Sequence, residues 1–168
     1  MDPVTQQQVI DAFRGATKSE VKRVTFPTDF DDLDFAALEY VGWRDKKIPR
    51  RAYVSVPTGG PDGEGLVTLL LTQAETKPKA KAMCTWCRDV TITSQAVLYT
   101  VRRGGPAGRK GDTIGVLVCE DFRCAANARK LPPAFHKGTD TEEIREQNLA
   151  DLRRRVTGFV AEVLSTEE

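Results

Sequence analysis

The sequence has little histidine, tryptophan or methionine, and it has no long apolar run. A membrane-spanning helix needs about 18 or more mostly apolar residues, so we expect no membrane anchor. The first residues lack the basic and apolar segments of a secretory signal. The chain is long enough for one domain with a buried core. We therefore expect a cytoplasmic protein that does not bind membranes.

The usual parts of an enzyme active site are also missing. The single histidine, His136, follows two prolines, and we interpret it as a surface or capping residue rather than a fifth metal ligand. The glycine-rich segment 59–65 is followed by neither a lysine nor a helix, which excludes a phosphate-binding loop of the Gly-x-x-x-x-Gly-Lys type. The acidic residues of 29–34 have plausible capping roles. We expect no catalytic activity and no small-molecule substrate.

The clearest chemical signal is a set of four cysteines, which are Cys84, Cys87, Cys119 and Cys124. Two residues separate the first pair and four separate the second. Structural zinc takes four such ligands in a tetrahedron, and a Cys-x-x-Cys turn supplies two of them from one loop. In the cytosol such pairs are more often metal ligands than disulfides. The spacing predicts a closed structural zinc site with no open position for a catalytic water, and buried free thiols or a disulfide are the alternatives.

Patterning in the first fifty residues predicts two helices. Asp2 and the proline after it suit the start of a helix over 3–13. Residues 21–26 fit a short strand or an extended arm. The acidic run at 29–34 would cap a short helix over 35–40, which we expect to end at Gly42.

Beyond residue 51 the pattern predicts strands at 51–56, 66–72, 97–101 and 113–118. The apolar strand at 66–72 should be central in the sheet. The glycine-rich segment 102–111 is expected to be a loop at the tip of a hairpin.

A zinc knuckle, a hairpin and a helix over 122–130 would form a treble clef, with Cys119 on the strand and Cys124 on the helix. A last helix is predicted after Asp140, because apolar residues recur there at nearly 3.6-residue spacing. The predicted fold class is α+β: an antiparallel sheet with a treble-clef zinc finger and flanking N- and C-terminal helices. We divide the chain into an N-terminal helix, 1–16, and a single zinc-finger domain, 17–168, with the zinc site within 84–130.

Basic residues are concentrated around the predicted zinc site. Between residues 102 and 130 there are seven basic side chains against three acidic ones, whereas 140–168 is acidic. The candidate partner-binding residues are Arg102, Arg103, Arg109, Lys110, Arg123, Arg129 and Lys130. They could contact nucleic-acid phosphates or form a solvated surface. Trp86, inside the knuckle, could anchor a partner or cover the zinc site.

Several segments resemble one family. They are Met-Cys-Thr-Trp-Cys-Arg-Asp at 83–89, Val-Cys-Glu-Asp-Phe-Arg-Cys at 118–124, the Arg102-Arg103 hairpin, Val-Gly-Trp-Arg-Asp at 41–45 and Arg-Ala-Tyr-Val at 51–54. Together they are similar to the C-terminal treble-clef zinc-finger domain of the elongation factor G-binding protein family, which the fusidic acid resistance proteins share. The resemblance implies structural Zn²⁺ and binding to translation elongation factor G. In the resistance proteins, such binding helps the drug-stalled factor to leave the ribosome. Direct binding of ribosomal RNA through the basic hairpin is the alternative.

Overall fold

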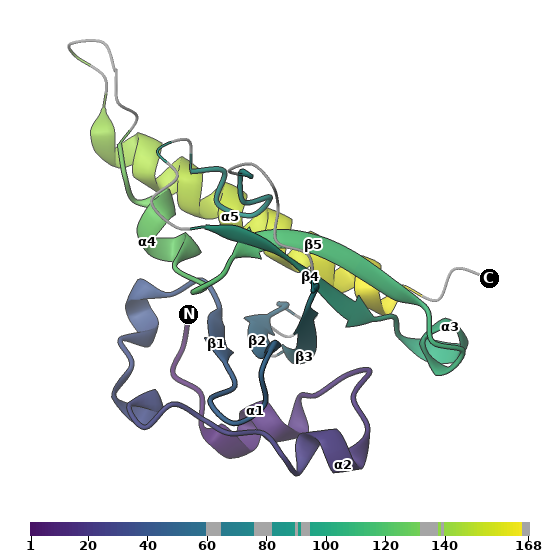
Figure 1. Cartoon of the computed structure of the whole chain (residues 1–168). Helices are drawn as coiled ribbons and strands as arrows, with labels where there is room; N and C mark the ends of the chain where they lie inside the picture. The colour runs from purple at the N-terminus through teal and green to yellow at the C-terminus, as the bar shows by residue number, and fades with distance from the viewer. Residues whose placement is uncertain are drawn as a thin grey trace.

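The computed structural model describes residues 1–59, 65–75, 82–89, 91, 95–131, 138 and 140–165. Its centre is a five-stranded antiparallel sheet in which the strands are neighbours in chain order. The strands are β1 (Val41–Arg44), β2 (Arg51–Pro57), β3 (Leu66–Gln73), β4 (Ala96–Arg102) and β5 (Thr113–Cys119). The α+β class and the four predicted strands are confirmed, and the apolar β3 is central as expected (Figure 1).

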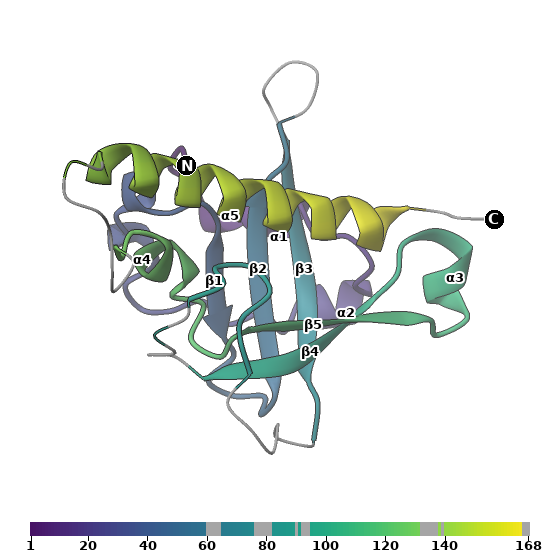
Figure 2. The same ribbon diagram turned by 90° about the horizontal axis from the view of Figure 1, so that it is seen from above.

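The sheet consists of two parts with a narrow junction. β3 pairs with β2 from Leu66 to Thr72 but with β4 only at Leu71, Thr72 and Gln73. Figure 2 shows β4 and β5 crossing the direction of β1–β3 at a large angle. Because β4 diverges from β3, one edge of the first half of β3 is free to pair with another segment.

The N-terminal segment takes that position on β3. Thr68 accepts a hydrogen bond from the Arg14 N–H and donates its own N–H to the Ala12 carbonyl, both at 2.9 Å. Its hydroxyl donates to the carbonyl of Val9, also at 2.9 Å. The segment includes α1 (Gln6–Asp11) and the short helix α2 (Lys18–Val21). It forms a layer on one side of the sheet (Figure 1).

The predicted start of the first helix is wrong. Thr5, not Asp2, is the N-cap: its hydroxyl accepts from the Gln8 N–H, and the Gln8 side chain accepts from the Thr5 N–H. This reciprocal capping box satisfies two backbone donors, which the Asp-Pro pair would not do.

The structure has a strand, β1, where the end of a helix was predicted. Residues 35–40 do not form an α-helix; two 3₁₀ turns, η1 (Phe30–Asp32) and η2 (Phe35–Ala37), precede β1. Gly42 lies inside β1 rather than at a helix end. Val41 and Trp43 alternate with it and are both buried, so burial of these side chains outweighs the local helix signals.

Gly42 is required because the Phe122 ring lies against it. A Cβ at this position would lie 2.6 Å from the Phe122 Cγ. We expect Gly42→Ala to destabilise the protein by about 1–3 kcal/mol, since overpacking forces the surrounding side chains to move. Gly158 is the matched control, because it is exposed on a helix and a Cβ there would meet nothing within 4 Å. Gly158→Ala should stabilise the protein by about 0.5–1 kcal/mol. Urea unfolding of both variants measures the two changes in the free energy of unfolding. Equal changes would contradict the prediction.

A long helix, α5 (Thr141–Leu164), covers the other side of the sheet (Figures 1 and 2). Asp140 caps it, as predicted, by accepting from the N–H groups of Glu142 and Glu143. Its buried face follows the predicted spacing and comprises Leu152, Val156, Phe159, Val160 and Val163. None of the described helices is both long and apolar enough to cross a membrane.

α5 also contacts both ends of the zinc-finger half, which consists of the knuckle, the β4–β5 hairpin and α4. Near its start, the Arg145 side chain donates to the carbonyl of Arg129 at 3.3 Å. In its middle, Arg155 donates to the carbonyl of Trp86 at 3.0 Å. At its end, the Val163 carbonyl accepts from the N–H of Gly104 at 2.7 Å. The helix thus connects the knuckle region to the tip of the β4–β5 hairpin.

Candidate metal centre

Three segments bring the four cysteines together. The turn 84–87 supplies the first pair, β5 ends at Cys119, and α4 (Cys124–Ala128) begins at Cys124. The predicted placement of Cys119 on a strand and Cys124 on a helix is therefore confirmed. The order of knuckle, hairpin and helix is that of a treble clef.

The sulfur positions fit a tetrahedral ion. The Sγ atoms of Cys84 and Cys124 are 3.6 Å apart, and those of Cys87 and Cys119 are 3.7 Å apart. All four sulfurs lie within 4.8 Å of one another, and none forms a disulfide. A zinc ion with Zn–S bonds of about 2.3 Å would need sulfurs about 3.8 Å apart. The cluster therefore has the donor set and the size for zinc.

Two residues with positive φ tighten the turns around this cluster. Arg88 has φ 51° directly after the knuckle, and its N–H donates to the carbonyl of Cys84 at 3.0 Å. Phe122 has φ 56° between the other two cysteines, and its N–H donates to the carbonyl of Cys119 at 3.0 Å. Such backbone is costly for residues other than glycine and persists where the surroundings impose it.

Electrostatics favours a bound cation at this cluster. Hydrogen bonds with Cys119 and Cys124 hold the pKa of the Cys84 thiol far below its ordinary value. Hydrogen bonds with Cys119 and Cys84 raise the pKa of the Cys124 thiol far above it. Four neighbouring thiols cannot all ionise without a counter-charge, because each thiolate disfavours the next. Zinc removes this conflict, since it binds cysteines as thiolates.

Asn127 supports the cluster from α4, a role that no sequence pattern indicates. Its buried Nδ2 lies 3.5 Å from the Cys119 sulfur and 3.8 Å from the Cys87 sulfur. The Lys130 ammonium donates to the Asn127 Oδ1 at 2.8 Å and to Asp89 at 3.0 Å. Lys130 thus fixes which end of the amide faces the sulfurs. Such hydrogen bonds orient metal ligands and stabilise thiolate charge.

Trp86 lies in the core, where it packs beside the metal cluster. Its side chain is 2% exposed, and its ring centroid is 5.1 Å from that of Tyr40 and 5.8 Å from that of Phe159. A side chain buried in this way offers a partner no surface. The ring belongs to the same buried cluster as Cys84, Cys119 and Cys124, and a role of Trp86 in covering the zinc site stays a prediction.

The structure divides the seven basic candidates into separate groups. The hairpin tip and α4 lie at opposite ends of α5 (Figure 2), so these residues do not form one continuous surface. At the α4 end, Arg123 is exposed, and Arg129 lies 3.8 Å from the buried Glu39. Lys130 is engaged with Asp89 and Asn127.

The hairpin tip is not the loop that was predicted. It contains a short helix, α3 (Gly105–Arg109), with Pro106 in its first turn. A Cβ on Gly108 would lie 1.7 Å from the Arg103 carbonyl oxygen, so the glycines permit a close turn of helix against strand. Arg109 and Lys110 are exposed at this tip.

Arg102 points away from the tip. Its guanidinium donates to the carbonyl of Gly15 at 3.0 Å and forms an ion pair with Glu20 at 3.3 Å. It therefore holds the N-terminal layer against β4. His136 lies outside the described residues.

These features define a zinc-binding treble clef built on an antiparallel α+β domain. The chain matches the FBP C-terminal treble-clef zinc-finger family over residues 8–163, and it belongs to that family. The resemblance inferred from the sequence is thereby confirmed. Together with the four-cysteine cluster, family membership identifies the cofactor as structural zinc. The search of curated proteins gave no match.

Proposed function

We propose that the domain is a zinc-stabilised binding module, active in the cytosol, whose partner is translation elongation factor G. The observation that carries this proposal is the family match, which extends over nearly the whole chain. The metal site supports a binding role rather than catalysis, because four thiolates complete the zinc coordination. In this proposal zinc stabilises the structure of the binding surface. The protein changes the action or release of elongation factor G without covalent chemistry.

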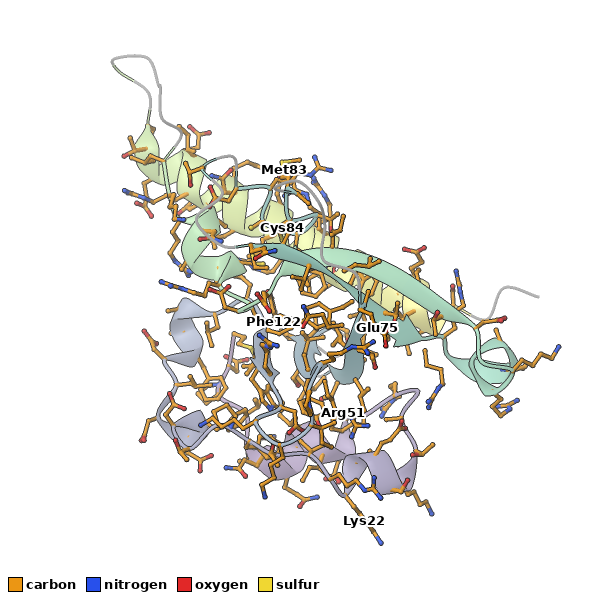
Figure 3. All side chains as sticks on the ribbon, in the orientation of Figure 1. Lys22, Arg51, Glu75, Met83, Cys84 and Phe122 are labelled. Atoms are coloured by element: carbon orange, nitrogen blue, oxygen red, sulfur yellow. The ribbon has the colours of Figure 1, made fainter. Side chains whose placement is uncertain are left out.

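The exposed hairpin tip is our candidate for the contact surface. Arg109 is the last residue of α3, and Lys110 follows it as the C-cap. β5 joins this tip to the zinc site, and the end of α5 holds it by a hydrogen bond to Gly104. Charge at the edge of an interface contributes mainly to association rate and specificity. The double variant Arg109→Glu, Lys110→Glu tests this surface, with the exposed Lys22→Glu on the N-terminal layer as control (Figure 3).

Gel filtration with purified elongation factor G checks the proposal. We expect the zinc-loaded protein and the Lys22→Glu control to co-elute with the factor, and the double variant to bind about tenfold or more weakly. Chelation should abolish co-elution because the surface loses its scaffold. Absence of co-elution by the zinc-loaded protein, with and without nucleotide on the factor, would remove the proposal.

Direct binding of ribosomal RNA is the second candidate, favoured by the same exposed charges beside backbone glycines. Contacts with phosphates would make affinity fall steeply with salt, with a log–log slope of about −0.7 per contact on single strands. Elongation factor G free of RNA would then not be retained. The two candidates therefore differ in the purified partner that suffices for binding.

A further inference from the structure

A second site lies on the face of the sheet that the N-terminal layer covers only in part. It is a cavity of about 110 Å³, several times the space that one water needs. Residues from the N-terminal segment and from all four strands β2–β5 line it. It lies on another part of the fold from the zinc site, and none of the four cysteines lines it.

Strand register explains why polar side chains gather there. Arg51 on β2 is opposite Thr72 on β3, and Thr72 is opposite Thr100 on β4. Directly opposed residues point to the same face, so these three form a polar row across the sheet. Arg102 follows Thr100 by two residues and is opposite Thr113 on β5, which extends the row.

Three arginines line the cavity, and they have little acidic compensation. Arg102 is paired with Glu20, the acidic residue in the lining. Arg14 donates to the backbone carbonyls of Asp11 and Phe13. Among the lining residues, three guanidinium groups against one carboxylate leave a surplus of two positive charges, which the Asp45 carboxylate behind the Tyr53 hydroxyl offsets in part. A net positive charge of this size suits a phosphate monoester near pH 7.

One hydrogen-bond donor of Arg51, a residue that lines the cavity, is without a partner. Its Nη1 is buried and has no hydrogen-bond partner among the residues that the structure describes. The same guanidinium lies beside the Tyr53 hydroxyl. Figure 3 places Arg51 between the sheet and the N-terminal layer. A buried donor without a partner is unfavourable, and a turn of the guanidinium toward an oxyanion in the cavity that Arg51 lines would satisfy it.

We propose that this cavity binds a phosphate group through Arg14, Arg51 and Arg102, with the Thr72 and Thr113 hydroxyls as further donors. Guanidinium groups suit phosphate because their planar N–H pairs match two of its oxygens. A tetrahedral anion can accept from three directions, whereas a carboxylate has two oxygens. Phosphate binding here does not depend on the proposed protein partner.

The neighbouring surface extends the site. A wider hollow of about 770 Å³ adjoins the cavity and shares Gly15, Ala16 and Arg102 with it. Arg103 and Arg109 line the far part of this hollow, together with glycines of the hairpin tip. No aromatic side chain is among the described residues that line either hollow. The chemistry is therefore that of phosphate recognition rather than base stacking.

Titration of the zinc-loaded full chain with inorganic phosphate, followed by NMR of the backbone amides, tests the site. At constant ionic strength we expect saturable shifts at Gly15, Ala16 and Thr113, and none with chloride. Arg51→Gln should weaken binding by about tenfold or more, since a charged donor pair is lost. Lys22→Gln removes one positive charge at an exposed position that lines neither hollow and should change affinity by less than about twofold.

A second variant protects the test against misfolding of the first. Thr72→Val keeps the shape of an exposed strand position and removes one donor, so binding should weaken by a few-fold. Absence of saturable shifts in the wild-type protein, or equal affinity in Arg51→Gln and wild type, would overturn the proposal. The arginines would then serve only to hold the N-terminal layer.

Two further ligands show whether the site accepts free or terminal phosphate groups or also phosphodiesters. Pyrophosphate and a short oligoribonucleotide without terminal phosphates are compared with inorganic phosphate. Binding of the inorganic anions alone assigns the site to a terminal or free phosphate, and binding of all three assigns it to phosphodiesters as well. Binding of the oligonucleotide alone would contradict the cavity site, because general attraction between charges would account for it.

Discussion

Removal of zinc is expected to abolish the cooperative folding of the zinc-finger half. The four cysteines join the knuckle, the end of β5 and α4, and α4 has only five residues. A helix of that length is not stable by itself in water. Zinc binding contributes about 10–16 kcal/mol in small zinc domains, which is comparable to the whole stability of about 5–15 kcal/mol of a typical domain.

Thermal unfolding followed by circular dichroism, with and without a strong chelator, measures this effect. We expect one zinc ion per chain before chelation, a large fall in melting temperature after it, and recovery when zinc is restored. Cys124→Ser should lower the melting temperature similarly, because the buried hydroxyl is a poor zinc ligand. An unchanged unfolding transition in protein from which zinc has demonstrably been removed would contradict the structural role.

Truncation of Trp86 is expected to have the next largest effect. The side chain is buried between Tyr40 and Phe159, so Trp86→Ala should cost about 3–5 kcal/mol. Its Nε1 is buried without a hydrogen-bond partner among the described residues. Trp86→Phe keeps an aromatic ring and removes this unsatisfied donor, so it should cost much less than Trp86→Ala.

Urea unfolding of both variants, with zinc content determined in each, separates the two roles considered for Trp86. A packing role predicts large destabilisation by alanine and a small effect of phenylalanine. If both variants kept wild-type stability and lost only partner binding, Trp86 would be an anchor, contrary to its burial.

The metal site was predictable because its ligands are close in sequence. Cys84 and Cys87 belong to one turn, and Cys119 and Cys124 flank another, so the spacing alone indicates the coordination. Alternation and apolar runs likewise located four strands. By contrast, β1 was missed because Gly42 is usual at helix ends, and the Phe122 ring that requires it is eighty residues away.

Tertiary contacts also decided the positions of the basic residues. Arg102 and Arg103 are adjacent in sequence, yet Arg102 turns to Glu20 and the N-terminal layer. Strand alternation could have shown that the two point to opposite faces. The cavity with Arg14 and Arg51 could not have been inferred, because it depends on the register of four strands and on the pairing of Thr68 with the N-terminal segment.

The length of α5 has a consequence for multivalent recognition. Its 24 residues extend about 36 Å, and its bonds to Arg129 and Gly104 fix the α4 end and the hairpin tip to one rigid rod. A ligand that touches both ends therefore meets two surfaces at a constant spacing. Once one contact has formed, the second is effectively intramolecular, so two individually weak contacts can together give strong avidity.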